Sequence, residues 1–438
     1  MAHLPARKYS IRNMPQSKEV KAISEHLRKP TDVEIVNMLR NKGFVDYAQV
    51  GCSITDTISD LWKEMARREE INLTTTTHEH NLPPIAAGIY FGTGRPALIH
   101  MQNSGLPNAG DGIISLASVY KIPMLVLVTW RGSNERDDSE PHQAIGTKTS
   151  KLTRDIIGNK HVYGNQDGKG FIKAIEKAVD AVNNGEVAMV RLSPDAFQKK
   201  HELSLPNEGE IFSQKEYLKQ LGMMQKLAKT KGALSSPIPT NVKLSRDEAL
   251  IAIVANHPDA AVIFSNGYTA RAAQEVVDRH GNFYSTGNMG GALAMGWALA
   301  RSNPDIEVVV VDGDQNAQMS TMKDNLKAEY PENLYWYILN NGIGASVGTI
   351  PSVPLSLDYY QLARVIPTMP DALGSFKYPR VNARGVYFES KKAKKMAEQQ
   401  GTLPAHAQMF RQWIQEKTAR NLKKRKSISS LHPLLIGA

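Results

Sequence analysis

Oxygen-bearing side chains follow two apolar runs within residues 306–348. Asp314 comes after the first run, and Asn341 comes after the second. Parallel strands end at a common edge of a sheet, so we expect the carboxylate of Asp314, the amide oxygen of Asn341 and the backbone carbonyl of Ile343 to converge there. Mg²⁺ takes such oxygens together with water and phosphate oxygens. The stretch predicts a Mg²⁺ site, with an ordinary strand-to-helix turn as the alternative.

A carboxylate between two histidines ends another predicted strand and precedes a helix of small residues. It is Glu79, flanked by His78 and His80. In a site poor in water its pKa would rise and it could share a proton with a ring nitrogen, whereas a helix-cap or surface glutamate is the alternative. The two histidines can handle protons or contact substrate, and His142 is a weaker candidate for the same work. The sequence nearby offers no third ligand of the zinc type.

Polar residues that can bind an anion follow two further predicted strands. Gln102, Asn103 and Ser104 offer amide and hydroxyl groups, and Arg131 follows the next apolar run. We predict that these residues bind an anionic or polar substrate head, although a capped turn and a surface arginine would look the same. Cys52 lies in a turn nearby without an obvious base partner, so we expect an inert thiol.

Two glycine-containing turns in the second half of the chain can receive an anion. The first precedes a helix, whose N-terminus attracts negative charge, and consists of Asn266, Gly267, Tyr268 and Thr269. In the second, glycines permit close backbone approach, and its residues are Gly287, Asn288, Met289, Gly290 and Gly291. A glycine-rich helix start used only for packing is the alternative for the second turn.

These residues require a scaffold of parallel strands with helices between them. Apolar runs alternate with helical patterns over residues 30–192 and again over 246–385, which predicts two doubly wound α/β domains. Residues 193–245 lose this alternation and are predicted to be a linker. We expect residues 1–29 to form an N-terminal arm and residues 386–438 a C-terminal basic extension containing an amphipathic helix.

The composition excludes several classes of protein. The 438 residues are 41% hydrophobic and 22% charged, as in a soluble globular protein. The longest apolar runs are too short to span a bilayer, and the first residues lack the apolar core of a secretory signal, so we expect a cytoplasmic protein without a membrane partner. A single cysteine excludes an intrachain disulfide. The net charge of +10 arises mainly from a basic run near the C-terminus, which argues against nucleic acid as a partner.

Several of these segments together resemble one known family. Gly313 and Asp314, followed after a spacer by Asn340 and Asn341, are similar to the motif Gly-Asp-Gly, spacer, Asn-Asn that binds thiamin diphosphate; Gln315 stands where that motif has its second glycine. The segments MQNSGL at 101–106 and WRG at 130–132 are similar to those of phosphonopyruvate decarboxylases and sulfopyruvate decarboxylases. The chain thus resembles this thiamin-diphosphate-dependent family.

The resemblance implies a fold and a set of ligands. It implies two doubly wound parallel-sheet domains of the thiamin-diphosphate-binding fold, a pyrimidine-binding domain at 30–192 and a diphosphate-binding domain at 246–385. Thiamin diphosphate and Mg²⁺ are the implied cofactors. Glu79 would contact the aminopyrimidine of the cofactor and Met289 would support its bent form. The remaining cofactor residues would be Asn266, Gly267, Tyr268, Thr269, Gly287, Asn288, Gly313, Asp314, Gln315 and Asn341, with Asp314, Asn341 and Ile343 on the metal.

The implied activity is the decarboxylation of an anionic 2-oxo acid. Conversion of phosphonopyruvate to phosphonoacetaldehyde and CO₂, in phosphonate biosynthesis, is our first expectation, and sulfopyruvate is the next substrate. A thiamin-dependent carboligase and a catalytically silent paralogue remain open. A dinucleotide-binding oxidoreductase is disfavoured because no G-x-G-x-x-G follows the first strand. The resemblance also implies a homodimer or higher homo-oligomer with active sites at the subunit interface.

Overall fold

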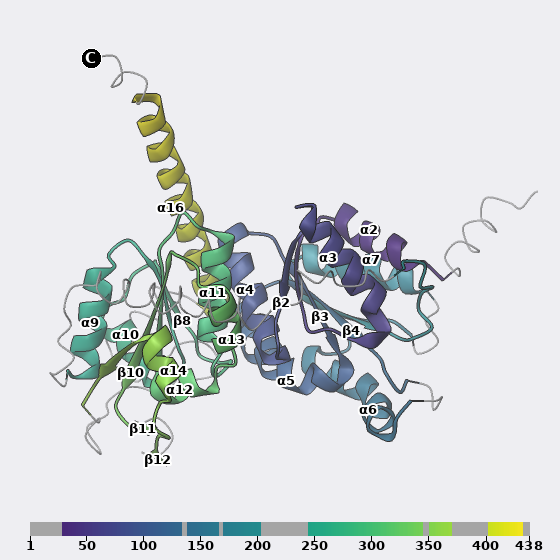
Figure 1. The fold of residues 1–438 in the computed structure, drawn as a ribbon, viewed down its shortest axis with the longest axis horizontal. Helices are drawn as coiled ribbons and strands as arrows, with labels where there is room; N and C mark the ends of the chain where they lie inside the picture. The colour runs from purple at the N-terminus through teal and green to yellow at the C-terminus, as the bar shows by residue number, and fades with distance from the viewer. Residues whose placement is uncertain are drawn as a thin grey trace, which may run out of the picture.

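The computed structural model describes residues 29–133, 138–165, 170–202, 244–344, 350–369 and 402–431. Two parallel sheets, each flanked by helices, form its two halves (Figure 1). The predicted fold class is therefore confirmed. Nearly all of the predicted arm and most of the predicted linker lie outside the described residues.

The first sheet has the strand order β2-β1-β3-β4-β6-β5, and its strand pairs are parallel. Its strands are β1 (Asp46–Gln49), β2 (Asn72–Thr75), β3 (Ala97–Gln102), β4 (Met124–Thr129), β5 (Val162–Tyr163) and β6 (Val187–Leu192). Its helices are α2 (Asp32–Asn41), α3 (Asp56–Arg67), α4 (Leu82–Thr93), α5 (Leu106–Asp111), α6 (Glu140–Ile157) and α7 (Phe171–Asn183). The central strands β3 and β4 are mostly apolar and are buried along nearly their whole length, because helices cover both faces of the sheet.

The second sheet has the order β13-β10-β9-β7-β8, also with parallel pairs. Its strands are β7 (Ala261–Phe264), β8 (Asn282–Tyr284), β9 (Val308–Gly313), β10 (Leu334–Asn340) and β13 (Arg364–Pro367). Its helices are α9 (Arg246–Asn256), α10 (Tyr268–Val276), α11 (Ala292–Ser302), α12 (Asp314–Met319), α13 (Lys323–Ala328) and α14 (Leu357–Leu362). A small antiparallel pair, β11 (Ile343–Gly344) and β12 (Ile350–Pro351), follows β10.

Local sequence signals set the ends of the helices. Thr31 caps α2 in a capping box with Glu34. Gly43, with φ +94°, then turns the chain away from the helix toward β1. Ser245 and Glu248 form the same box at the start of α9. These caps fix where the first helix of each half begins.

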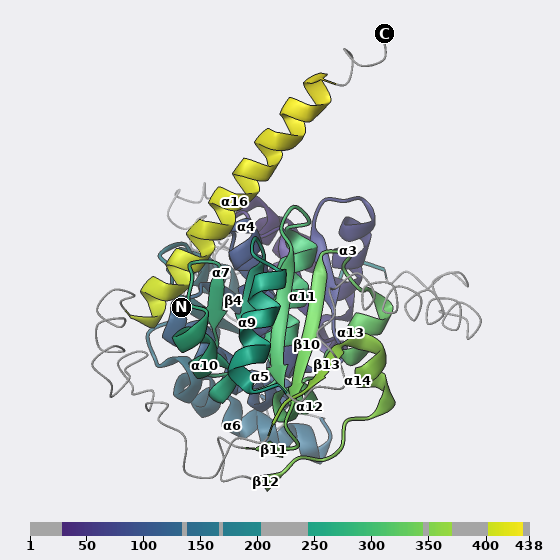
Figure 2. The same cartoon turned by 90° about the vertical axis from the view of Figure 1, so that its left-hand side faces the viewer.

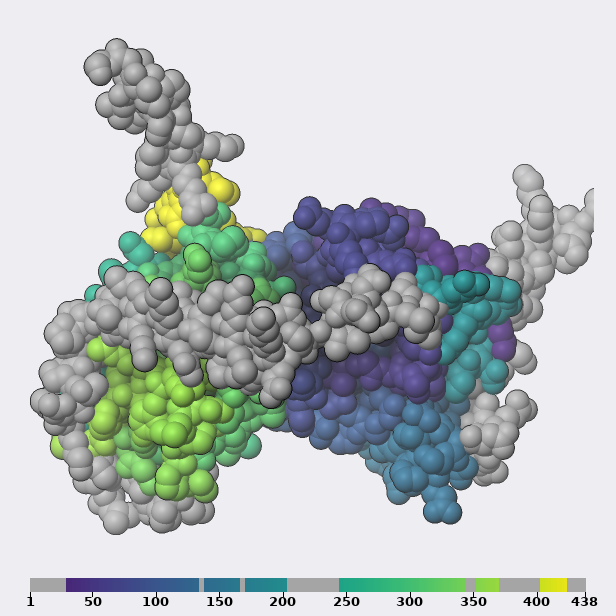
Figure 3. Space-filling model, in the orientation of Figure 1, coloured from purple at the N-terminus to yellow at the C-terminus, as the bar shows by residue number. Residues whose placement is uncertain are grey.

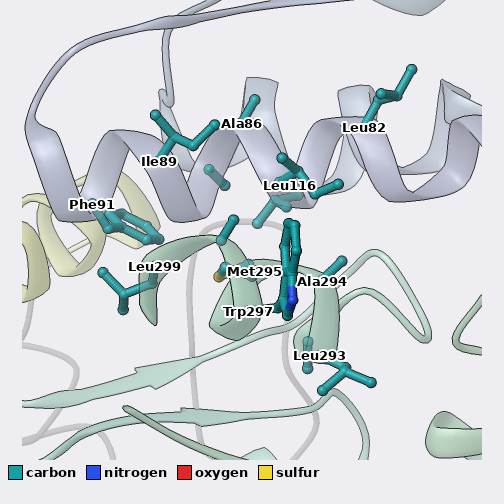
Figure 4. Packing of buried hydrophobic residues seen from close by; sticks show 14 of the residues in the cluster. Leu82, Ala86, Ile89, Phe91, Leu116, Leu293, Ala294, Met295, Trp297 and Leu299 are labelled. Atoms are coloured by element: carbon teal, nitrogen blue, oxygen red, sulfur yellow. The ribbon is translucent and has the colours of Figure 1, made fainter. Parts of the chain in front are cut away.

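Helices α4 and α11 join the two halves in one hydrophobic core. Both helices are apolar on nearly every side, so they are buried rather than amphipathic (Figure 4). A Cβ atom at Gly88 would lie 2.2 Å from the carbonyl oxygen of Met295, so the close approach of the two backbones requires glycine. In the space-filling view the two halves lie directly against one another (Figure 3).

The C-terminal helix α16 (Leu403–Leu431) contributes to this core at its beginning. Phe410 and Ile414 are fully buried, and the ring of Phe410 lies 5.2 Å from that of Phe91 on α4. The predicted amphipathic helix is present, but this part of the predicted extension is packed and not solvated. The helix then projects beyond the body of the protein (Figures 1 and 2). No helix among the described residues combines the length and apolar character needed to cross a membrane.

A fully buried histidine in β3 should make the protein sensitive to acid. Burial lowers the pKa of His100 to about 4. Its Nε2 lies 2.9 Å from Thr55 Oγ1, and Nδ1 has no partner. The unfolded chain therefore takes up the proton first as pH falls through its ordinary pKa of 6.5, and at about pH 5 this costs on the order of 2 kcal/mol of folding stability.

We expect the folding stability of the variant His100→Gln to lose the part of its pH dependence that comes from this histidine. The variant should be less stable than the wild type near pH 8, because a buried ring is lost. The difference in stability between the two proteins should decrease as the pH falls to about 5. Melting temperatures of both proteins across this range test the expectation. A difference in melting temperature that stays constant with pH would contradict the assigned role of His100.

Candidate active site

The carboxyl group of Glu79 lies at the carboxyl edge of the first sheet. Glu79 begins a short 3₁₀ turn, Glu79–Asn81, between β2 and α4. Its side chain rests on the backbone of Gly105, in the turn after β3. A Cβ atom at residue 105 would lie only 2.2 Å from its carboxyl carbon. Asn108 Nδ2 on α5 donates to Glu79 Oε2 at 3.2 Å. The structure thus places Glu79 in a fixed position at the predicted sheet edge.

The histidines beside Glu79 have different surroundings. His78 Nδ1 accepts a hydrogen bond from the backbone N–H of His80 at 3.2 Å, and no acid, cysteine or further histidine of the described chain completes a three-ligand cluster with them. Burial lowers the pKa of His80, against the charge of Asp111, so this ring is neutral near pH 7. The backbone carbonyls of Met289 and Asn108 also face the ring of His80. His80 therefore links Glu79 to the second half of the chain.

Asp314 lies at the carboxyl edge of the second sheet and is 4% exposed. Its Oδ1 accepts from the backbone N–H of Gln315 at 2.9 Å, and Oδ2 accepts from that of Gly342 at 3.1 Å. Burial raises the pKa of Asp314 in spite of these bonds. Asn341 and Ile343 flank Gly342, so the structure brings the three predicted metal ligands into one loop region. A cation there would stabilise the buried carboxylate.

Gln315 stands in the first turn of α12 with an ordinary helical backbone. Among described residues other than glycine, a positive φ occurs only at Glu69, Lys121 and Asn288. The backbone at residue 315 therefore does not require glycine. Glutamine therefore adopts the conformation of this turn without backbone strain.

The two glycine-containing turns meet at Asn316 of α12. Gly267 has φ +88° and precedes α10. Asn316 Nδ2 donates to the backbone oxygen of Asn266 at 3.1 Å, and Asn316 Oδ1 accepts from the N–H of Gly290 at 3.2 Å. Thr269 is buried close to Gly313. The sequence analysis missed Asn316, which follows the predicted metal motif by two residues.

The remaining residues of these two turns differ in their surroundings. Met289 is 51% exposed. The ring of Tyr268 lies 5.5 Å from the guanidinium of Arg246 and 5.5 Å from that of Arg271. A Cβ atom at Gly287 would collide with Ser115 of the first half. The glycine is therefore needed for contact between the two halves.

Asn288 has an unusual backbone and an unsatisfied side chain. Its φ is +55°, it is 3% exposed, and neither Oδ1 nor Nδ2 has a hydrogen-bond partner. Its backbone N–H donates to Ser115 Oγ at 2.8 Å, in a π-helix (Gly112–Ser118) of the first half. Strained and unsatisfied groups of this kind concentrate at functional sites.

The two halves of the predicted site therefore meet within one chain. His80 and Ser115 from the first half contact the turn that carries Met289 in the second. We expected the site to lie between two subunits. Within the single chain, the packing of α4 on α11 brings these segments of the two halves together. Active sites at a subunit interface stay a prediction.

The predicted substrate turn after β3 divides into exposed and buried parts. Gln102 Nε2 donates to Ser104 Oγ at 2.6 Å, and Ser104 is exposed. Asn103 is fully buried, and its Nδ2 donates to the backbone oxygen of Arg131 and to Thr149 Oγ1. The side-chain N–H group of Asn103 is thus used inside the protein, where it holds Arg131, while Oδ1 is buried without a partner. Binding of substrate by Asn103 stays a prediction.

Cys52 lies beneath this turn, as a buried thiol. Its Sγ donates to Gln102 Oε1 at 3.4 Å and lies 3.2 Å from Thr129 Oγ1. These contacts support the expectation of a packed, inert thiol. They also restrain the side chain of Gln102.

Arg131, which we predicted to bind an anionic substrate, forms an ion pair with Asp138. Its Nε and Nη2 donate to the two carboxylate oxygens of Asp138, at 3.0 and 2.7 Å, and Nη1 lies 3.5 Å from Ser53 Oγ. The hydrogen bonds from Arg131 hold the pKa of Asp138 at about 2. His142 Nδ1 lies 2.9 Å from the same carboxylate. His142 therefore belongs to this ion-pair group and not to the surroundings of Glu79.

Lys199 is a second cation near Ser53 that the sequence analysis did not identify. Its Nζ donates to the backbone oxygen of Ser53 at 3.1 Å and to the carboxylate of Asp56. Arg131 and Lys199 thus approach Ser53 from two segments, after β4 and after β6. Their separation in the chain explains why no local motif revealed the pair.

Comparison with known proteins identifies the family. Residues 34–152 match the family described as thiamine pyrophosphate enzyme, N-terminal TPP binding domain. A phosphonopyruvate decarboxylase of Streptomyces hygroscopicus is 30% identical over 316 residues, which cover 71% of this chain and 72% of that protein. The chain belongs to the phosphonopyruvate decarboxylase family. The resemblance inferred from its motifs is confirmed.

Two further proteins are similar to this member of the phosphonopyruvate decarboxylase family, one in sequence and one in fold. A sulfopyruvate decarboxylase of Methanosarcina acetivorans is 24% identical over 323 residues, 72% of this chain and 77% of that protein. The solved 4-hydroxybenzoylformate decarboxylase of Rhodococcus jostii RHA1 superposes with a TM-score of 0.54 at 12% identity, covering 76% of this chain and 92% of that one. The latter similarity shows the fold alone.

The residues present fit the cofactor used by thiamine pyrophosphate enzymes. Asn266 Oδ1 and both amide atoms of Asn288 are buried polar groups without partners, on the two turns that face the sheet edge. Gly267 stands at the N-terminus of α10, where no side chain caps the helix. Asp314 supplies a buried carboxylate at the same edge. This donor set suits a phosphorylated ligand held through a hard cation.

Proposed function

We propose that this chain is a decarboxylase that removes CO₂ from an anionic 2-oxo acid, with phosphonopyruvate as its first substrate and phosphonoacetaldehyde as the product. Thiamin diphosphate and Mg²⁺ are the proposed cofactors. The observation that carries the proposal is the position of Glu79, whose carboxyl rests on Gly105 while the neighbouring His80 faces Met289 of the opposite half. The relatives named phosphonopyruvate decarboxylase support this choice of substrate.

Each half of the site has its own task in this proposal. Asp314, Asn341 and the carbonyl of Ile343 would hold Mg²⁺. Residues 266–269 and 287–289, with residues 313–315, would hold the diphosphate and the thiazolium end of the cofactor. When bound, thiamin diphosphate supplies a carbon nucleophile and an electron sink for the departing carboxylate.

Glu79 would exchange a proton with the aminopyrimidine of the cofactor. Its fixed position on Gly105 favours this because a general acid or base must stay within hydrogen-bond reach of its partner. His80, neutral near pH 7, can hold or release a proton at Nε2, which is buried and without a partner. His78, whose Nδ1 accepts the backbone N–H of His80, would orient this ring. These residues would manage the protons of the reaction.

The anionic end of the substrate would bind near Ser53. Arg131 Nη1 and Lys199 Nζ both reach this serine, and Gln102 and Ser104 lie at the same sheet edge. Asp138 holds the other two guanidinium nitrogens, which orients Nη1 toward the site. A phosphonate carries more charge than a carboxylate alone, so it gains most from two cations.

Removing the Arg131 charge should weaken the reaction of phosphonopyruvate selectively. Since Arg131→Met alone would leave Asp138 without a partner, we choose the double variant Arg131→Met/Asp138→Asn. We expect kcat/KM for phosphonopyruvate to fall about 100-fold, equivalent to almost 3 kcal/mol, and that for pyruvate to change by less than about threefold. Steady-state kinetics with both acids, and with Asp138→Asn as the control, measure this. Equal losses for both acids would contradict the assigned site.

The second candidate substrate is sulfopyruvate. The Methanosarcina acetivorans relative named sulfopyruvate decarboxylase favours it, and the same cations would bind a sulfonate. We also propose that residues 30–192 and 246–385 are the pyrimidine-binding and diphosphate-binding domains. A cytoplasmic homodimer or higher oligomer remains part of the proposal. Relatives named as alpha subunits of sulfopyruvate decarboxylase are in keeping with assembly.

A further inference from the structure

We propose that Asn108 is a positioning residue that holds the carboxyl group of Glu79 for its proton exchange. The inference rests on the proposed function, because it concerns the same carboxylate. Asn108 lies on α5 and contacts Glu79 across 29 positions of sequence. Among the described residues, Asn108 is the side chain that donates a hydrogen bond to the carboxylate of Glu79.

Two contacts together define the position of the carboxylate. The Nδ2 group of Asn108 donates to Oε2 at 3.2 Å. Oε1 and the carboxyl carbon lie over the Cα of Gly105, where a Cβ atom would approach each to 2.2 Å. Asn108 thus fixes one oxygen from the side, and Gly105 supports the group from below. The turn after β3 therefore supports the carboxyl group of Glu79 and also carries the residues that we assign to the substrate.

A neutral amide donor suits this role better than a charged one. It favours the ionised carboxylate through a hydrogen bond but does not neutralise it, so the carboxylate can still accept a proton. The backbone carbonyl of Asn108 also faces the ring of His80. Asn108 therefore contacts both groups that we assign to proton transfer. The other titratable groups of this region are His78, beside Glu79 in sequence, and Asp111 at the end of α5.

Asn108→Asp tests the role with little change in volume. The variant replaces the donor by a second carboxylate at hydrogen-bond distance, so the pKa of Glu79 should rise by about one unit or more. We would follow the Glu79 carboxyl by NMR of protein labelled with ¹³C at the glutamate carboxyl carbons, without cofactor. The signal is assigned by its loss in Glu79→Gln. Asn184→Asp, which adds the same charge at the exposed end of α7, should leave the midpoint unchanged.

Gly105→Ala tests the contact between Gly105 and Glu79 without changing any charge. Residue 105 has φ −86°, which alanine adopts without strain, so the contact with Glu79 is the main obstacle to a side chain. We expect kcat to fall about 100-fold or more with KM changed less than about threefold. Gly110→Ala, on the helix α5 that follows Gly105, is the matched control, because its Cβ would meet only Ile156 at 3.7 Å. That control should retain activity.

The outcomes separate this inference from the proposed function. A raised Glu79 midpoint in Asn108→Asp supports the positioning role even if the wild type decarboxylates none of the acids offered. An unchanged midpoint, with wild-type pH profiles for kcat in Asn108→Asp, would overturn the role while leaving the decarboxylase in place. Equal activity of Gly105→Ala and Gly110→Ala would contradict the claim that Gly105 positions the carboxyl group of Glu79.

Discussion

Glu79→Gln is expected to bind thiamin diphosphate almost as the wild type does and to lose turnover by about 100- to 10,000-fold. Losses of this size follow removal of a positioned general acid or base. Glutamine has nearly the same shape and can still lie on Gly105, so folding and cofactor binding should persist. Its amide cannot exchange the proton that the carboxylate exchanges. Initial rates with phosphonopyruvate, and cofactor affinity by calorimetry, measure both parts of the prediction.

Glu176→Gln provides the control for the loss of one carboxylate. Glu176 lies on α7, which covers the far side of the first sheet from the core shared with α11. It should keep full turnover. If Glu79→Gln also kept full turnover, the proton exchange would belong to another residue, and His80 would be the next candidate.

Asp314→Ala is expected to abolish Mg²⁺-dependent binding of thiamin diphosphate. Asp314 is a buried carboxylate at the predicted metal position, and removing one partner of a buried charge pair costs about 3–5 kcal/mol. This corresponds to a loss in affinity on the order of 100- to 5,000-fold. Calorimetric titration with the cofactor at several Mg²⁺ concentrations measures the effect. Affinity that no longer responds to Mg²⁺ is the specific sign of a lost metal ligand.

Two further variants separate charge from structure at this position. Asp314→Asn keeps an oxygen that can accept the N–H of Gly342 but removes the charge, so it should also weaken the response to Mg²⁺. Asp324→Ala removes an exposed carboxylate from the first turn of α13 and should bind the cofactor normally. Unchanged binding by Asp314→Ala would refute the metal assignment.

Strand ends were the most informative feature of the sequence. Buried parallel strands are continuous apolar runs, so the residues that follow them can be located without a structure. This placed Glu79 and Asp314 correctly at the carboxyl edges of their sheets. The motifs in which they stand then indicated the family, which the comparisons confirm.

The pattern of apolar and polar residues in the sequence could not predict in which direction the side chains of a turn point. Asn103 and Ser104 are neighbours with similar polarity, yet one is fully buried and the other exposed. The ion pair of Arg131 with Asp138 and the contact of Asn108 with Glu79 depend on how separate turns pack. Such contacts form only when tertiary structure brings distant segments together, and no local period encodes them.

Joining of the two halves in one chain was also outside the prediction. The apolar character of α4 and α11 indicated buried helices but not which surfaces they would cover. In the structure each helix covers the other, and this brings the turn of Met289 to His80. The active sites at a subunit interface that family analogy implies stay a prediction.

The most direct test of the account is a product balance for phosphonopyruvate with the purified protein, thiamin diphosphate and Mg²⁺. We predict one CO₂ and one phosphonoacetaldehyde for each molecule of acid consumed, with neither product formed when cofactor or metal is omitted. Sulfopyruvate and pyruvate, offered in parallel, should react more slowly. Tight, Mg²⁺-dependent cofactor binding without CO₂ release from any of the three acids would contradict the proposed reaction.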